Sequence, residues 1–132
     1  MMTKMLMMLM LLVSTNVLAV DWVKTGGTDD FDKYLNPQSI RRDGNKVKVW
    51  TLKDYKSGQV LGDNKTRFFS DVLRYEYDCF EDTNRLIDLY SYSGKMGQGD
   101  IVLSIPNVTI PAGSVIPGSI GAATLKLVCA TK

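Results

Sequence analysis

Carboxylates are the candidate acid–base residues considered for this chain, because its 132 residues include no histidine. The absence of imidazole excludes a Ser–His nucleophile, a histidine proton shuttle and histidine metal ligands. Four acidic residues lie close together: Glu76, Asp78, Glu81 and Asp82. Two carboxylates can act as an acid and a base, but alternation with aromatic residues favours the solvated face of a strand. We therefore expect no catalytic residue, no cofactor and no metal site.

A second chemical feature is a cluster of positive charge beside an aromatic residue. Its members are Arg41, Arg42, Lys46, Lys48 and Trp50. Guanidinium and ammonium groups next to an exposed indole suit the recognition of an acidic protein segment. A charged edge hairpin that discourages sheet-to-sheet aggregation would contain the same residue types. We take these five residues as the candidate protein-binding site and keep the edge hairpin as the alternative.

Residues 1–19 predict a signal peptide that directs export. An apolar run from Met5 to Val13 is followed by small residues before a cleavage site between Ala19 and Val20. Nine apolar residues in a helix span about 14 Å, roughly half of the hydrocarbon core of a bilayer, so a transmembrane anchor is not expected. We expect the mature domain at residues 20–132, in the periplasm, at the cell surface or secreted.

The net charge argues against nucleic acid as a partner. The whole chain carries a formal charge of +2, and removal of Lys4 with the signal peptide leaves +1. A nearly neutral domain is not drawn strongly to nucleic acid or to an anionic membrane. Recognition by this domain should therefore depend on local features of its surface.

Both cysteines, Cys79 and Cys129, lie in the mature domain. Because the compartments outside the cytoplasm are oxidising, we expect a disulfide bond in the one pairing that two cysteines allow. Such a bond closes a loop of about 50 residues and would contribute on the order of 4 kcal/mol through the unfolded state. Two buried free thiols are the alternative.

The mature domain consists of short β-rich segments separated by turn-forming residues, which predicts an antiparallel sheet. Strands are expected near residues 21–24, 31–35, 46–52, 67–80, 85–92 and 101–105. Asp43-Gly44-Asn45 marks a tight hairpin. We expect Gly26-Gly27 to end the first strand, residues 58–65 to form a polar loop, and Asp82-Thr83-Asn84 to form a turn.

The C-terminal tail changes from a two-residue repeat to a spacing of three to four residues. Small and apolar residues recur on one stripe from Gly121 to Cys129, and Pro117 and Ser119 can open a helix. The stripe places Cys129 against the sheet. Cys79 occupies the same alternate positions as the tyrosines of the predicted strand 67–80, so its side chain should point toward the core. The predicted class is α+β, with an antiparallel sheet of about five to six strands and a C-terminal helix in one domain.

A series of short motifs runs in a fixed order through the mature chain. They are Trp22-Val23-Lys24, Tyr34, Ser39 to Asn45, Val49-Trp50, Asp54-Tyr55-Lys56, Tyr77-Asp78-Cys79, Tyr92-Ser93-Gly94, Gly99 and Pro117-Gly118-Ser119 through Cys129. Their order and spacing resemble the bacterial surface-adhesin protein E family over nearly the whole mature chain. The resemblance implies a curved antiparallel sheet with a C-terminal helix tied to it by a disulfide.

The namesake of that family is an outer-membrane lipoprotein that binds host matrix and serum proteins such as vitronectin, laminin and plasminogen. The resemblance therefore implies an exported, non-enzymatic binding module with partners of this kind. This chain has no lipidation cysteine after its signal peptide, so the alternative is a soluble periplasmic structural or stress-related domain with no host ligand. A homodimer is compatible with both interpretations.

We expect the exported protein to begin at Val20 and to contain no free thiol. The small residues before Ala19 suit the signal peptidase, and the inward parity of Cys79 suits pairing with Cys129. Intact-mass analysis before and after alkylation checks both points. A retained N-terminus, or two thiols that react with the alkylating reagent in denaturant, would contradict them.

Overall fold

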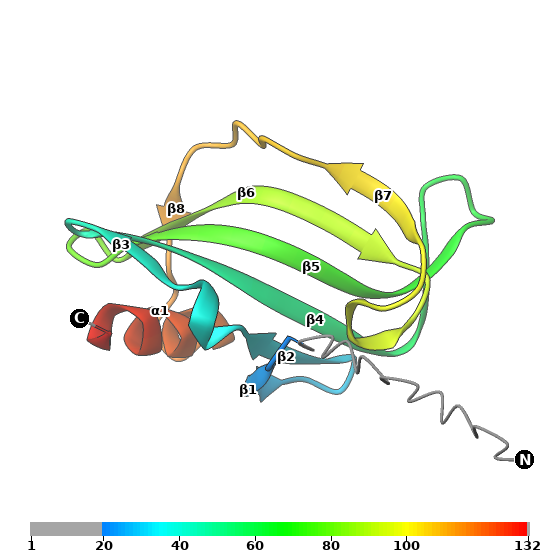
Figure 1. The fold of residues 1–132 in the computed structure, drawn as a ribbon, viewed down its shortest axis with the longest axis horizontal. Coiled ribbons are helices and arrows are strands. Elements are labelled where there is room, and N and C mark those ends of the chain that lie inside the picture. The colour runs from blue at the N-terminus through cyan, green and yellow to red at the C-terminus, as the bar shows by residue number, and fades with distance from the viewer. Residues whose placement is uncertain (1–19, 132) are drawn as a thin grey trace, which may run out of the picture.

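Six strands form the main path of one antiparallel sheet, in the order β1-β2-β4-β5-β6-β7 (Figure 1). They are β1 (Val23–Gly27), β2 (Phe31–Leu35), β4 (Lys46–Val60), β5 (Arg67–Asp78), β6 (Thr83–Tyr92) and β7 (Ile101–Ile105). Beside this path, β3 (Arg41–Asp43) pairs with β4, and β8 (Gly113–Ser114) pairs with β6. One α-helix, α1 (Ile120–Ala130), and two 3-10 turns, η1 (Pro37–Ser39) and η2 (Lys95–Gly97), complete the elements of the described part.

This computed structural model describes residues 20–131. The predicted signal peptide at residues 1–19 lies outside the described residues and stays a prediction. Within residues 20–131, no helix has the length and the apolar character that crossing a membrane requires.

Alternation along β4 defines the two faces of the sheet. Val47 and Val49 are fully buried, whereas Lys46 and Lys48 are exposed. Because successive side chains of a strand point to opposite faces, the valines mark an inner face and the lysines an outer face. The predicted hairpin before β4 is confirmed, since β3 and β4 pair directly across it.

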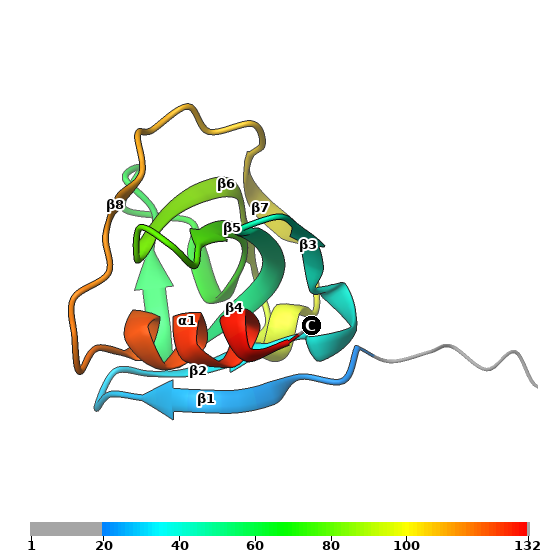
Figure 2. The same ribbon diagram turned by 90° about the vertical axis from the view of Figure 1, so that its left-hand side faces the viewer.

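The helix α1 packs against the inner face at one end of the sheet. Its residue Val128 is fully buried and joins Leu35, Val47, Val49 and Tyr77 in the hydrophobic core. Figure 2 shows β1 and β2 below the helix and β4, β5 and β6 above it, so the sheet curves around α1. The predicted α+β class, with a curved antiparallel sheet and a C-terminal helix, is therefore confirmed.

Polar contacts fix both ends of α1. The Ser119 hydroxyl oxygen accepts a hydrogen bond from the Ala122 N–H at 3.1 Å and caps the N-terminus of the helix. At the other end, the Arg42 guanidinium donates to the carbonyl oxygens of Cys129 and Thr131, at 3.2 and 2.8 Å. Carbonyls in the last turn have no partner within a helix, so Arg42 ties β3 to the C-terminus of α1.

A disulfide bond joins Cys79, just after β5, to Cys129 in the last turn of α1. The expected pairing is confirmed, and the alternative of two free thiols is wrong. Both half-cystines pack against the hydrophobic core. The bond therefore holds the helix on the same part of the inner face that Val128 occupies.

Strand β4 is longer than predicted. It continues through Gly58 to Val60, where we expected a polar loop. Its register with β5 shifts between Asp54 and Gln59, so an irregularity in the ladder accommodates the glycine. A Cβ at position 58 would lie 3.0 Å from the Phe69 ring, which packs where glycine has no side chain.

Two other strand ends also differ from the prediction. β1 continues through Gly26 and Gly27, which we expected to end it. A Cβ at Gly26 would lie 3.4 Å from Ile120, so the absent side chain lets the start of α1 approach β1. β6 begins at Thr83, and the turn lies earlier than predicted, with Asp82 in the left-handed region at a φ of 52°.

Replacing Cys129 with Ser should lower the free energy of unfolding by about 2–4 kcal/mol and loosen α1 before the sheet melts. Only Thr124 and Val128 of the helix are buried, so α1 depends strongly on its covalent link. Hydrogen exchange should show lower protection of the α1 amides, with β4 and β5 little changed. Equal protection of α1 in the variant and the wild type would show that packing alone holds the helix.

Candidate binding surface

The four basic residues of the predicted site lie together on the β3–β4 hairpin. Together with Asp43 and Glu76, they line a hollow of about 220 Å³; the four are Arg41, Arg42, Lys46 and Lys48. We call it the basic hollow. Its acidic residue Glu76 lies 3.1 Å from the Arg85 Nε and 3.9 Å from the Lys46 Nζ. Glu76, one of the four carboxylates considered for catalysis, therefore forms ion pairs with cations on the outer face.

The basic residues do not have equal roles. Arg42 holds the C-terminal carbonyls of α1, so its charge serves the fold. Arg41 donates to the nearby carbonyl oxygens of Gln38 and Ile40, at 2.8 and 3.0 Å, and Lys48 is exposed. Arg41 and Lys48 are therefore the cations that can meet a partner without disturbing the helix.

Trp50 is on the same outer face as Lys48, two residues further along β4, but its ring borders a different hollow. It stacks on Tyr90 with ring centroids 6.2 Å apart. The Arg74 guanidinium lies 5.3 Å from the Trp50 ring, and its Nε donates to the buried Asp88 carboxylate at 2.7 Å. These contacts hold the indole in one position.

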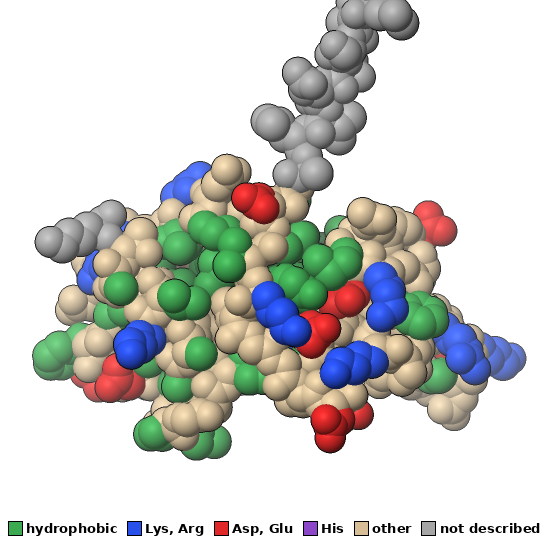
Figure 3. Space-filling model, turned by 90° about the horizontal axis from the view of Figure 1, so that it is seen from below, with side chains coloured by type: hydrophobic (Ala, Val, Ile, Leu, Met, Phe, Trp, Pro, Cys, Tyr) green, Lys and Arg blue, Asp and Glu red, His purple; other side chains and the backbone are tan. Residues whose placement is uncertain are grey.

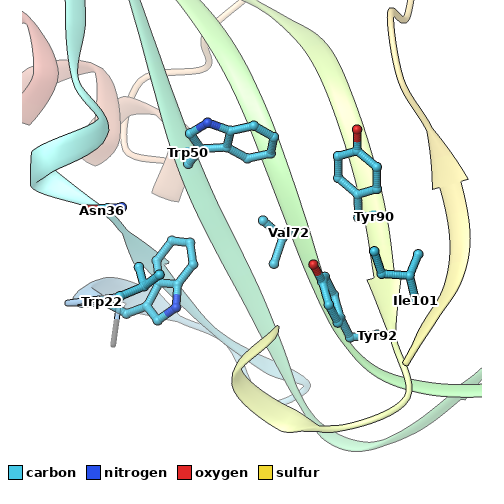
Figure 4. Close-up of a pocket in the computed structure, with 8 residues that line it drawn as sticks. Trp22, Asn36, Trp50, Val72, Tyr90, Tyr92 and Ile101 are labelled. Atoms are coloured by element: carbon cyan, nitrogen blue, oxygen red, sulfur yellow. The ribbon is translucent and has the colours of Figure 1, made fainter. Parts of the chain in front are cut away.

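Aromatic and aliphatic side chains from β4, β5, β6, β7 and the segment before β1 form a groove on the outer face, which we call the aromatic groove (Figure 4). Its volume is about 330 Å³, and it is lined by Val20, Trp22, Asn36, Trp50, Val72, Tyr90, Tyr92 and Ile101. Figure 4 shows Trp22 and Trp50 on one side, Tyr90 and Tyr92 on the other, and Val72 between them. The groove is therefore an apolar slot with aromatic walls.

The turn η2 extends the groove. A second hollow, of about 580 Å³, shares Trp22 and Tyr92 and continues to Met96 and its neighbours. The Asp54 carboxylate accepts a hydrogen bond from the Met96 N–H, and the Ser70 hydroxyl oxygen accepts one from the Gly97 N–H, both at 2.9 Å. η2 is thus fixed to the sheet as one rim of the apolar surface.

The apolar surface is open to solvent in the described part of the chain. Ile101 and Val20 at its edges are 52% and 51% exposed. Seen from below, charges of both signs are scattered over the molecule, and hydrophobic side chains gather near the base of the grey trace (Figure 3). Exposed apolar side chains that gather in this way are typical of an interaction site.

The sequence interpretation found Trp50 but missed the rest of the aromatic groove. The sequence did contain a signal for the missed part of the groove, which is the segment 85–92, apolar on both faces. A sheet with one core needs apolar residues on one face only, so Tyr90 and Tyr92 indicated a second apolar surface. Trp22 carries no such signal, because its place in the groove depends on how the chain enters β1.

Comparison with known families identifies the chain. Residues 22–130 match the family described as surface-adhesin protein E. The chain belongs to this family. Membership implies an exported or cell-surface protein, as the resemblance of the motifs suggested. No curated protein sequence matches the chain.

Solved structures of the family share the fold. Protein E of Haemophilus influenzae, in its crystal form II, superimposes with a TM-score of 0.64 at 16% identity, over 86% of this chain and 94% of that one. Protein E from non-typeable Haemophilus influenzae gives a TM-score of 0.65 at 17% identity, over 88% of this chain and 79% of that one. At this identity the likeness concerns the fold alone.

The inner face carries a different feature, a row of polar side chains that we call the inner polar row. Its members Lys33, Lys53, Asp71 and Ser91 lie opposite one another on β2, β4, β5 and β6. Lys33 and Asp71 are each 8% exposed. The Asp71 carboxylate accepts hydrogen bonds from the hydroxyls of Tyr55 and Ser91, at 2.7 and 2.6 Å.

Burial shifts the pKa values of this row and of the tyrosines around it. Desolvation and the neighbouring Lys53 ammonium lower the pKa of Lys33 from 10.5 to about 7. Burial raises the pKa of Tyr77 to about 12 and raises the pKa of Tyr75 and Tyr55, the latter also through its hydrogen bond to Asp71. Lys33 is therefore the group of this set that titrates near neutral pH.

Replacing Lys33 with Met should stabilise the protein, and the gain should shrink as the pH rises. The pKa of Lys33 is lower in the folded than in the unfolded chain, so below pH 7 both states carry the charge and its burial costs most. Between about pH 7 and pH 10 the folded state has released a proton that the unfolded state retains, and wild-type stability rises with pH. The gain from Lys33→Met should therefore fall by about 2–3 kcal/mol between pH 6 and pH 9 in chemical unfolding.

Lys48→Met, at an exposed position, is the control for this measurement. Its effect on the free energy of unfolding should be small at every pH. A pH-independent effect of Lys33→Met would show that the folded state does not disfavour the Lys33 charge.

Proposed function

We propose that the chain is an exported, non-enzymatic binding module whose outer face holds a segment of a host matrix or serum protein. The observation that carries this proposal is the aromatic groove, an apolar slot that no described element covers. Membership of an adhesin family supports the same conclusion. Vitronectin, laminin and plasminogen are the partners that the resemblance implies.

The side chains of the groove are of the kind that dominate protein interfaces. Tryptophan and tyrosine offer a large contact area with few rotatable bonds, and binding energy concentrates on them. Trp50 is already held by Tyr90 and Arg74, so little side-chain freedom is lost when a partner docks. A preorganised aromatic slot therefore favours slow dissociation of an apolar or aromatic anchor.

The basic hollow gives the surface a second property. Lys48 and Trp50 are two residues apart on one face of β4, which places them about 7 Å apart along the strand. One extended segment of a partner can therefore reach both the hollow and the groove. Acidic residues beside an apolar anchor would match this order of charge and apolar surface.

The double variant Arg41→Glu and Lys48→Glu should slow association with the partner on the order of tenfold at low salt, and less at 0.5 M salt, because the charges act over about a Debye length. Association rates on immobilised vitronectin, laminin and plasminogen measure this. Lys65→Glu with Lys126→Glu changes the net charge equally at exposed positions elsewhere and is the matched control. Equal rates in both double variants would remove the basic hollow from the binding surface.

The single variant Trp22→Ala should weaken binding through faster dissociation, by about thirtyfold for a loss near 2 kcal/mol. Phe80→Ala removes a 77% exposed aromatic ring outside the groove and serves as its control. Unchanged dissociation of Trp22→Ala would contradict the role of the groove. If the parent protein binds none of the three partners at micromolar concentration, the periplasmic domain without a host ligand replaces this proposal.

A further inference from the structure

A cavity separate from the outer face lies between the sheet and the first turn of α1. Its volume is about 180 Å³, and its lining includes Phe31, Lys33, Lys53, Tyr75, Ile120 and Gly121. The strand residues belong to the inner face, on the side of the sheet opposite the aromatic groove. We call this space the inner cavity.

Two ammonium groups share the inner cavity. Lys33 and Lys53 are direct cross-strand neighbours on β2 and β4, an arrangement in which like charges destabilise the sheet. Within the described part of the chain, neither side chain forms an ion pair or donates a hydrogen bond. Their charged ends lie over aromatic rings, with Lys33 Nζ 5.3 Å from the Tyr75 centroid and Lys53 Nζ 4.5 Å from the Phe31 centroid.

The Asp71 carboxylate in the inner polar row does not accept a hydrogen bond from either ammonium group. Both oxygens of Asp71 accept hydrogen bonds from hydroxyl groups, those of Tyr55 and Ser91. One carboxylate also leaves the pair of ammonium groups with an excess positive charge. A buried ammonium without a hydrogen-bond acceptor is costly, and Lys33 is only 8% exposed. An anion inside the cavity would supply the missing acceptor.

The start of α1 favours the same occupant. Gly121, in the first turn, lines the cavity, and the N–H groups of a first turn have no partners within the helix. The positive end of the helix dipole therefore lies beside the two ammonium groups. Phe31 and Ile120 add apolar walls that suit a short hydrocarbon tail.

We propose that the inner cavity is a binding site for a small carboxylate, whose anionic group sits between Lys33 and Lys53 and whose apolar tail contacts Phe31 and Ile120. The volume of the cavity suits a short-chain acid and is well below that of a drug-sized pocket. This site is independent of the aromatic groove, so it does not require the proposed adhesive function.

Isothermal titration of the exported protein with butyrate tests this proposal, and butyramide, of similar shape and no charge, is the matched ligand control. Butyrate should bind saturably at millimolar concentration, and butyramide should not. Lys33→Met and Lys53→Met should each weaken butyrate binding at least tenfold. Lys48→Met, on the outer face, should bind as the wild type does.

Proton linkage supplies a second readout. Because the pKa of Lys33 is about 7, binding of an anion at pH 7.5 should draw up to about three quarters of a proton onto it. Titrations in buffers of different ionisation enthalpy measure this uptake, and butyrate is fully ionised at that pH. Lys33→Met should abolish the uptake. The other titratable groups that face Lys33 are Lys53, Asp71 and Tyr75. Loss of the uptake in Lys33→Met therefore assigns the proton to Lys33.

Three outcomes would overturn the proposal. The first is the absence of saturable binding of butyrate to the wild-type protein, and the second is equal affinity in the wild type and Lys33→Met. The third is a set of chemical-shift changes confined to residues of the outer face, which would place the ligand elsewhere. None of these results bears on binding of host proteins, because the aromatic groove lies on the other side of the sheet.

Discussion

The structure depends on one short helix that covers one end of a long curved sheet. The 15 residues of β4 extend over about 50 Å, whereas the 11 residues of α1 rise about 16 Å. A helix of this length is marginal alone, and only two of its residues are buried. The disulfide to Cys79 and the contact of Arg42 with the last carbonyls therefore keep α1 on the inner face.

This mismatch in length explains where the two candidate sites lie. Only the start of α1 reaches the end of the inner face that carries the inner polar row in place of an apolar core. On the outer face η2 covers Leu52 and part of Val72, where a Cβ on Gly97 would lie 3.2 and 3.0 Å from their side chains. Apolar side chains further along that face remain open as the aromatic groove. Both sites thus follow from incomplete coverage of the sheet.

Local sequence patterns were sufficient for the class of fold and for the disulfide, because strand alternation and the helical stripe are local and two cysteines allow one pairing. They failed at Gly58 and Gly26, where Phe69 and Ile120, on other elements, pack against the position that a Cβ would occupy. The candidate site was predicted in part. Four basic residues do lie together, but Trp50 belongs to the groove, and Arg42 serves the helix. Lys33 was missed because its burial depends on the position of α1.

The low identity to solved relatives has a physical meaning for function. Protein E of Haemophilus influenzae shares this fold at 16–17% identity, so the fold tolerates replacement of most side chains. The fold requires apolar residues at the alternate strand positions that face the core, a short helix, and the disulfide that links this helix to the sheet. The exposed residues at the edges of the aromatic groove, such as Ile101 and Val20, meet none of these needs, and they are free to change with the ligand. Which partner this chain binds therefore depends on its own groove and charges.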